Sequence, residues 1–226
     1  MVTERLRRAT APQGPPQLFL GLVDTQGAPE RFLAALHALK ATVIRPEIEL
    51  IEVPAPKRAA PFAVAIDGSV IAGTDDVDAN HLPAEGTFLL LYDPEGQTGW
   101  ESDFRVVTYV EADLNPVEAR DPLVSAMAWT WVVDALGHLP VRNLSGTVSV
   151  ITSASFGGLQ QVPNAARVEI RASWSPTSEQ VGSHLAAWMA ILATAGGLEQ
   201  VPSDVTLLDS HRDRHAHRNS RRRRPH

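Results

Sequence analysis

The chain of 226 residues has no cysteine, so disulfides, thiolate metal ligands and a cysteine nucleophile are all excluded. It also has no long apolar run. No stretch approaches the roughly 18 apolar residues of a membrane span. The first apolar run, residues 18–23, is interrupted by Gly21 and is too short for a signal peptide. We therefore expect a cytoplasmic protein without a membrane partner.

Familiar catalytic signatures are missing as well. The sequence has no phosphate-binding GxxxxGK(S/T) loop, no GxGxxG, no GxSxG and no HExxH. Asp76, Asp78 and Asn80 mimic the first half of a calcium loop, but His81 stands where that loop needs glycine and Thr87 where it needs glutamate. A solvated acidic loop is the better interpretation, and we predict neither a metal site nor a cofactor.

Charge is distributed unevenly along the chain. The net charge is −6, yet residues 211–226 alone carry +6, which leaves −12 on residues 1–210. Because an acidic body repels phosphates, any nucleic-acid contact is expected through this tail. Two interpretations stay open: weak, salt-sensitive contact with RNA or another polyanion, and a solubilising extension without a binding role. The arginines concerned are Arg212, Arg214, Arg218, Arg221, Arg222, Arg223 and Arg224.

Composition along the chain predicts three parts. Residues 1–28 begin with a polar, proline-containing stretch and are expected to be a disordered N-terminal segment. Residues 29–205 are expected to form a single α+β domain, because 44% of the chain is hydrophobic, enough for a sizeable core. Residues 206–226 are expected to be a disordered Arg/His-rich tail.

Hydrophobic periodicity predicts three helices and six strands in the order α-β-β-β-β-α-β-β-α. Neighbouring strands with short loops favour a mostly antiparallel or mixed sheet of about six strands, with three helices packed on it. Within it, Asp67-Gly68 is interpreted as a turn, and residues 87–93 as a central strand covered on both faces. The expected helices are 29–41, 122–136 and 177–195, and the strands are 47–53, 62–69, 87–93, 104–114, 146–156 and 165–174.

Five residues are candidates for a binding groove: Trp100, Arg105, Trp129, Trp131 and Arg171. Trp129 and Trp131 point about 200° apart on one helix, so both cannot face the same core. Trp100 lies in the glycine-containing loop QTGWES, where an exposed aromatic suits recognition. The alternative for all three tryptophans is that they close the edges of the core.

Charged side chains on the strands allow two interpretations. Arg167, Glu169 and Arg171 share one strand face, where they could bind an anion or, as we favour, form cross-strand ion pairs. Arg105 interrupts an otherwise apolar strand, so its charge must find either a carboxylate or the surface. Glu47, Glu49 and Glu52 could be paired carboxylates for acid–base chemistry. A solvated strand face is the better interpretation of these three.

Several motifs together resemble a known family. They are RPEIELIEVPAPKRAAPFAVAI (45–66), FRVVTYVEADL (104–114), SFGGL (155–159) and VEIRASWSPT (168–177). The chain resembles, over about residues 30–205, an uncharacterised actinobacterial family catalogued as Domain of Unknown Function family three thousand. The resemblance implies a cytoplasmic bacterial protein, often encoded beside a ribonuclease D-like exonuclease, and hence a link to RNA metabolism. It implies no activity, cofactor or site residue, and it excludes both tails.

Three functions follow from these features. The leading hypothesis is a non-enzymatic binding or adaptor domain with a protein partner and weak RNA contact through the tail. The second is an enzyme with a non-local site for a small anionic substrate, and pairing of Arg171 with Glu169 on an open surface would remove its best residues. The third is a structural subunit of a homo-oligomer. The second hypothesis uses Arg58, Arg105 or Arg171 as the anion-binding group, and Glu47, Glu52 or Glu169 as the base.

Overall fold

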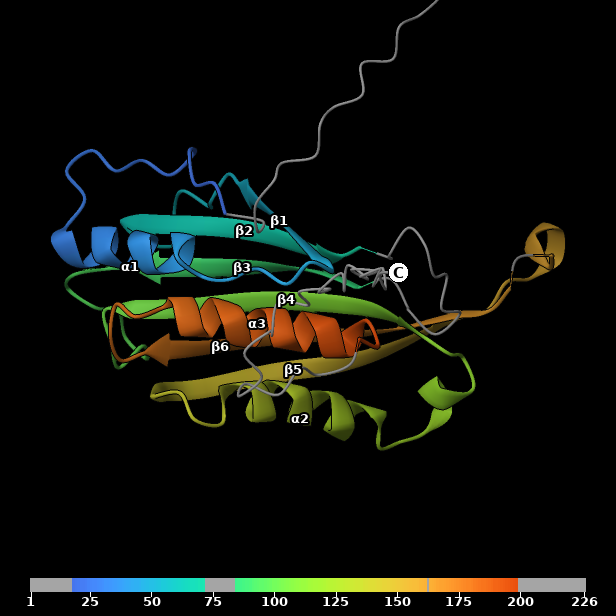
Figure 1. Ribbon diagram of the computed structural model, residues 1–226. Coiled ribbons are helices and arrows are strands. Elements are labelled where there is room, and N and C mark those ends of the chain that lie inside the picture. Colours follow the sequence, from blue (N-terminus) through green and yellow to red (C-terminus); the bar gives the residue numbers. More distant parts are fainter. Residues whose placement is uncertain (1–17, 72–83, 162, 199–226) are drawn as a thin grey trace, which may run out of the picture.

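The computed structural model describes residues 18–71, 84–161 and 163–198, and it contains one six-stranded antiparallel sheet (Figure 1). The strand order is β1-β2-β3-β4-β6-β5, and every neighbouring pair is antiparallel. The predicted α+β class and element order are confirmed. The elements are α1 (Glu30–Lys40), β1 (Ile48–Val53), β2 (Phe62–Val70), β3 (Ala84–Tyr92), β4 (Phe104–Leu114), α2 (Val124–Leu136), β5 (Val141–Ser153), β6 (Ala165–Pro176) and α3 (Gly182–Ala195).

The three helices lie on one face of the sheet, with α3 between α1 and α2 (Figure 1). Phe32 of α1 stacks on Tyr92 of β3, with ring centroids 5.8 Å apart. Val181 at the start of α3 and Leu185, Trp188 and Leu192 along it form an apolar stripe that is fully buried. No described helix packs on the opposite face of the sheet, which we call the open face. No helix in the described ranges is long and apolar enough to cross a membrane.

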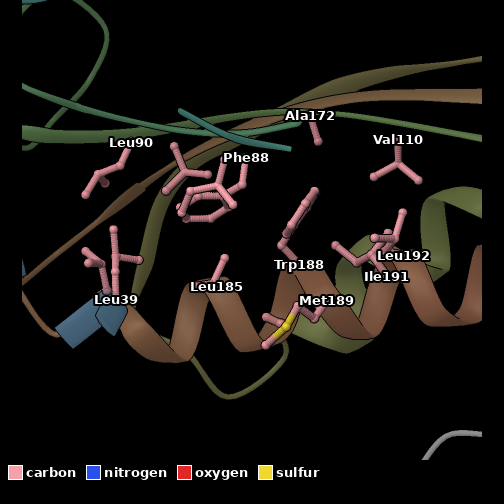
Figure 2. Packing of buried hydrophobic residues seen from close by; sticks show 14 of the residues in the cluster. Leu39, Phe88, Leu90, Val110, Ala172, Leu185, Trp188, Met189, Ile191 and Leu192 are labelled. Carbon is pink, nitrogen blue, oxygen red and sulfur yellow. The ribbon is translucent and has the colours of Figure 1, made fainter. Parts of the chain in front are cut away.

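The core is centred on Trp188, which points from α3 toward the sheet beside Phe88 (Figure 2). A Cβ at Gly68 would lie only 2.7 Å from Cη2 of Trp188, so glycine makes room for the indole. The predicted turn at Asp67-Gly68 is wrong, because β2 continues through both residues and pairs with β1 and β3. The glycine marks a close approach of a side chain to the sheet rather than a reversal of the chain.

Several element boundaries differ from the prediction. Helix α2 starts at Val124 instead of 122, since Asp121 accepts a 2.8 Å hydrogen bond from the Leu123 amide in the turn before the helix. Helix α3 begins at Gly182, after a turn in which Ser178 accepts a bond from the Gln180 amide. Strands β3 and β5 begin earlier than expected, because their polar or glycine-containing first residues still pair with a neighbouring strand.

Residues 18–28 pack against the domain and extend it beyond the predicted boundary at residue 29. Leu18 and Leu20 are buried in the core. The carboxylate of Glu52 accepts hydrogen bonds from the backbone amides of residues 21–23, at 2.7 Å from Leu22 and 2.8 Å from Val23. Glu52 is therefore an anchor for this segment, and its carboxylate lies on the helix side of the sheet.

Candidate binding groove on the open face of the sheet

The strand register places one residue from each strand in rows across the open face. The central row runs Ile51, Asp67, Thr87, Tyr109, Arg171 and Thr147. On one side of it lies the row Glu49, Ser69, Glu85, Glu111, Glu169 and Ser149, and on the other the row Val53, Ala65, Leu89, Val107, Ser173 and Ser145. Along the strands, the open face thus changes in character from row to row. The row that contains Glu49 is acidic, the central row is mixed, and the row that contains Val53 is apolar with hydroxyl groups at one end.

A groove of about 580 Å³ crosses the open face over β3, β4, β6 and β5. Its floor is apolar, and hydroxyl groups lie at its β5–β6 end. A second depression of about 310 Å³ lies over β1–β3, and Thr87 and Tyr109 line both hollows. The side chains of the groove are Thr87, Leu89, Val107, Tyr109, Ser145, Thr147, Arg171 and Ser173. We take this amphipathic surface as the candidate site.

The charged groups around Tyr109 are paired with one another. Arg171 donates a 2.7 Å bond to Glu169, and its guanidinium carbon lies 5.1 Å from the centroid of the Tyr109 ring. The Tyr109 hydroxyl donates to Glu111, which is also 3.7 Å from Arg167. Burial and this hydrogen bond raise the pKa of Tyr109 to about 12. The phenol is therefore neutral at physiological pH and is unsuited to act as a base.

Arg105 lies on the open face beyond Val107, and it is only 8% exposed. Its guanidinium donates to the Asn143 carbonyl at 3.0 Å, to Ser175 Oγ at 3.2 Å and to Ser173 Oγ. No carboxylate in the described ranges forms an ion pair with it, and burial lowers its pKa. The expectation that its charge reaches a carboxylate or the surface is wrong, since neutral oxygens bind it beneath the surface.

The structure brings only some of the predicted groove residues together. Arg171 lines the groove, and Arg105 contacts Ser173 at its end. Trp129 and Trp131 lie on α2, on the helix side, where both are half-buried against the core. Trp100 is half-buried in the β3–β4 loop, which is joined to β5 by a hydrogen bond that the side-chain amide Nδ2 of Asn143 donates to the Gly99 carbonyl. The three tryptophans do not share a groove with Arg171.

The residues that sequence reasoning missed are the apolar and aromatic ones of the groove floor, Leu89, Val107 and Tyr109. Strand 87–93 is central, as predicted, but the expected cover on its second face is wrong for Leu89, which is half-buried in the groove. The available signal was the alternation in 104–114, where Arg105, Val107 and Tyr109 share the face of Glu111. The large side chains on that face are typical of a core strand, although the helices cover only the opposite face of the sheet.

The groups proposed for an enzyme do not converge. Arg58 is exposed in the β1–β2 connection, Glu47 is 3.4 Å from Arg45, and Glu52 binds backbone amides on the helix side. Arg171 pairs with Glu169 of its own strand on the open face. The cross-strand pair that the ion-pair interpretation expected is formed instead by Arg167 of β6, which lies 3.7 Å from Glu111 of β4. Within the described ranges, no three His, Asp or Glu residues are placed to hold a metal. The calcium-like residues 75–81 and the tail arginines lie outside the described residues.

Together these features define an α+β domain with helices on one face of an antiparallel sheet and a shallow groove on the other. Residues 28–206 match the family described as protein of unknown function (DUF3000), and the chain belongs to that family. The resemblance noted from the strand motifs is thereby confirmed. No curated protein and no solved structure shows significant similarity to this chain.

Proposed function

We propose that this protein is a non-enzymatic binding domain that holds a protein partner on the open face of its sheet. The observation that carries the proposal is the groove of about 580 Å³, in which an apolar floor is flanked by hydroxyl groups. Protein-binding surfaces combine such an apolar centre with a polar rim. The three helices pack on the opposite face of the sheet, so the strands that carry the groove are supported from behind.

Charge favours a protein over a nucleic acid as the partner of this face. The row beside the groove carries Glu49, Glu85, Glu111 and Glu169, while Arg171 is neutralised by the last of these. Nucleic-acid affinity comes mainly from unpaired basic groups that contact phosphates. Sheet surfaces that bind single strands also present several aromatic rings for stacking, and here Tyr109 is the one aromatic residue of the groove.

The pairing of polar groups disfavours an enzyme. Acid–base or nucleophilic catalysis needs a reactive group that has a partner to activate it and access to the substrate. The Tyr109 hydroxyl is occupied by Glu111, and Arg171 by Glu169. The proposal also includes a cytoplasmic setting and weak, salt-sensitive RNA contact through the tail.

Because the chain has no cysteine, a single introduced cysteine is the one thiol that a maleimide reagent can label, and a site-specific crosslinking experiment can test the proposal. Val107→Cys places a thiol in the groove, and Val133→Cys places a matched thiol on the outer face of α2; the parent residues are 38% and 44% exposed. Each variant is labelled with a maleimide benzophenone and irradiated in an extract of its native cells. We expect a discrete crosslinked protein from position 107 and none from position 133.

Two outcomes would overturn the proposal. Identical crosslinks from both positions, or none from position 107, would mean that the groove is not the binding surface. A product of twice the chain mass from position 107 would instead favour the structural subunit of a homo-oligomer. Strand β5 is compatible with that alternative, because it is a long edge strand without the lysine or proline that commonly protects an edge.

A further inference from the structure

We infer that the β5–β6 end of the groove is a subsite for an anionic group, a carboxylate or a phosphate, borne on an apolar body. The inference rests on the proposed function of the groove as a binding surface and names the chemistry that this surface recognises. It follows from three observations: a buried cation that pairs with no carboxylate of the described residues, hydroxyl groups between that cation and the groove, and the apolar floor next to them.

The first observation is the unbalanced charge of Arg105. A buried charge is costly unless an opposite charge compensates it. Residues 1–210 carry 25 acidic groups, yet none in the described ranges pairs with Arg105. Its side chain is instead bound by one carbonyl and two hydroxyl oxygens. The site therefore has a positive charge that an incoming anion can balance.

The second observation is the position of Ser173 between Arg105 and the groove. Its Oγ accepts a hydrogen bond from Nη2 of Arg105, and the same residue lines the groove. A hydroxyl that accepts from a guanidinium still has its own proton to donate. Ser145, whose Oγ is 3.5 Å from that of Ser173, lies beside it in the groove. Two hydroxyl donors with a positive charge behind them suit an anionic oxygen.

The third observation is the separation of this end from the acidic row. Glu111 and Glu169 lie one row beyond Tyr109 and Arg171, on the side away from Ser173. The floor between is formed by Leu89, Val107 and the Tyr109 ring. A ligand can thus place an anionic group on the serines and an apolar body on this floor, with the carboxylates of the protein on the far side.

The inference is tested with three probes of the same shape: benzoate, phenyl phosphate and neutral benzamide. Each is titrated into the ¹⁵N-labelled full-length protein at constant ionic strength, and amide shifts are followed by NMR. We expect saturable shifts centred on Ser145, Ser173 and Val107 for at least one anion, with benzamide about ten-fold weaker. The ratio of the two anion affinities shows whether a carboxylate or a phosphate is preferred.

Two variants and a control test whether anion binding depends on Arg105 and on the Ser173 hydroxyl between it and the groove. Arg105→Gln removes the charge, and Ser173→Ala removes the hydroxyl while keeping the buried arginine. We expect each to weaken anion binding about ten-fold. Ser149→Ala, on β5 outside the groove, should bind as the unsubstituted protein does. If Arg105→Gln does not fold, Ser173→Ala decides the question.

Equal affinity for benzamide and the anions, unchanged binding by Ser173→Ala, or shifts located away from the groove would overturn the inference. The proposed function is judged separately by crosslinking from position 107. A persistent crosslink together with no anion binding would reject only the anionic subsite. Loss of both would reject the groove as a binding surface altogether.

Discussion

The indole Nε1 of Trp174 donates a 3.2 Å hydrogen bond to Nδ1 of His184, which joins β6 to α3 inside the core. Both residues are buried, at 0% and 2% exposure. Because Nδ1 accepts this bond, the imidazole is neutral and carries its proton on Nε2. Burial lowers the pKa of His184 to about 4. This contact requires a neutral imidazole, so the packing of the core around it depends on pH.

We predict that this histidine makes the fold sensitive to mild acid. Between pH 6.5 and about 4 the unfolded chain protonates His184 while the folded protein does not, so stability falls as the pH is lowered through this range. The loss from this group approaches about 3 kcal/mol at the lower end. Urea unfolding of the unsubstituted protein and of His184→Gln at several pH values checks this. Parallel pH curves for the two proteins would contradict it.

A second prediction concerns Gly68 and Trp188. A methyl group at position 68 would lie 2.7 Å from Trp188 and 2.9 Å from Leu50, so Gly68→Ala should cost about 1–3 kcal/mol of unfolding free energy. Gly158→Ala is the control, since a Cβ there meets nothing within 4 Å and it should change stability by less than about 0.5 kcal/mol. Equal effects in chemical denaturation would show that the close approach is unimportant.

The same glycine shows where sequence reasoning about the fold succeeds and where it fails. Alternation in residues 104–114 and the apolar stripe on α3 depend on local periodicity, and both the strand and the helix were predicted. Asp67-Gly68 has the composition of a turn, but the need for glycine comes from Trp188, a residue 120 positions away in the chain. Such a contact has no local signal, so a single sequence cannot distinguish it from a turn.

A third prediction follows from Glu52, which binds the backbone amides of residues 21–23. Glu52→Ala removes charge-assisted hydrogen bonds and should lower stability by about 1–2 kcal/mol. Amide hydrogen exchange at Leu22 and Val23 should accelerate as well. Glu49→Ala, from the opposite face of the same strand, is the control and should leave that exchange unchanged. Unaltered exchange in both variants would mean that other contacts hold the segment.

The candidate site was less accessible to sequence reasoning than the fold. Arg105 and Arg171 were singled out because a charge in a strand needs a partner, and the structure places both at the groove. The tryptophans were chosen for their aromatic character and for their local position in a loop or on a helix, and the packing of α2 over Gly146 directs Trp129 to the helix side. Which face of an antiparallel sheet is covered depends on where the helices return, and strand alternation does not contain that information.

The last prediction separates the tail from the domain. Residues 28–206 match the family, so the arginines from Arg212 onward lie outside the matched region. Residues 211–226 carry a net charge of +6, which opposes the −12 of the rest of the chain. Fluorescence anisotropy with a labelled RNA oligomer compares the full-length protein with a chain ending at Asp209, at two salt concentrations. We expect binding by the full-length protein alone, and that binding should weaken steeply with salt because counterions are released.

Each other outcome of the anisotropy experiment has a structural meaning. Equal binding by the shortened chain would mean that the folded domain contacts RNA despite its acidic row, and Arg105 and Arg171 would be the residues to substitute. No binding by either protein would remove the nucleic-acid role and leave the protein partner. The salt dependence adds a quantitative check: seven arginines limit the slope of log K against log salt to about −5 for single-stranded RNA. A much shallower slope would mean that few of them contact phosphates.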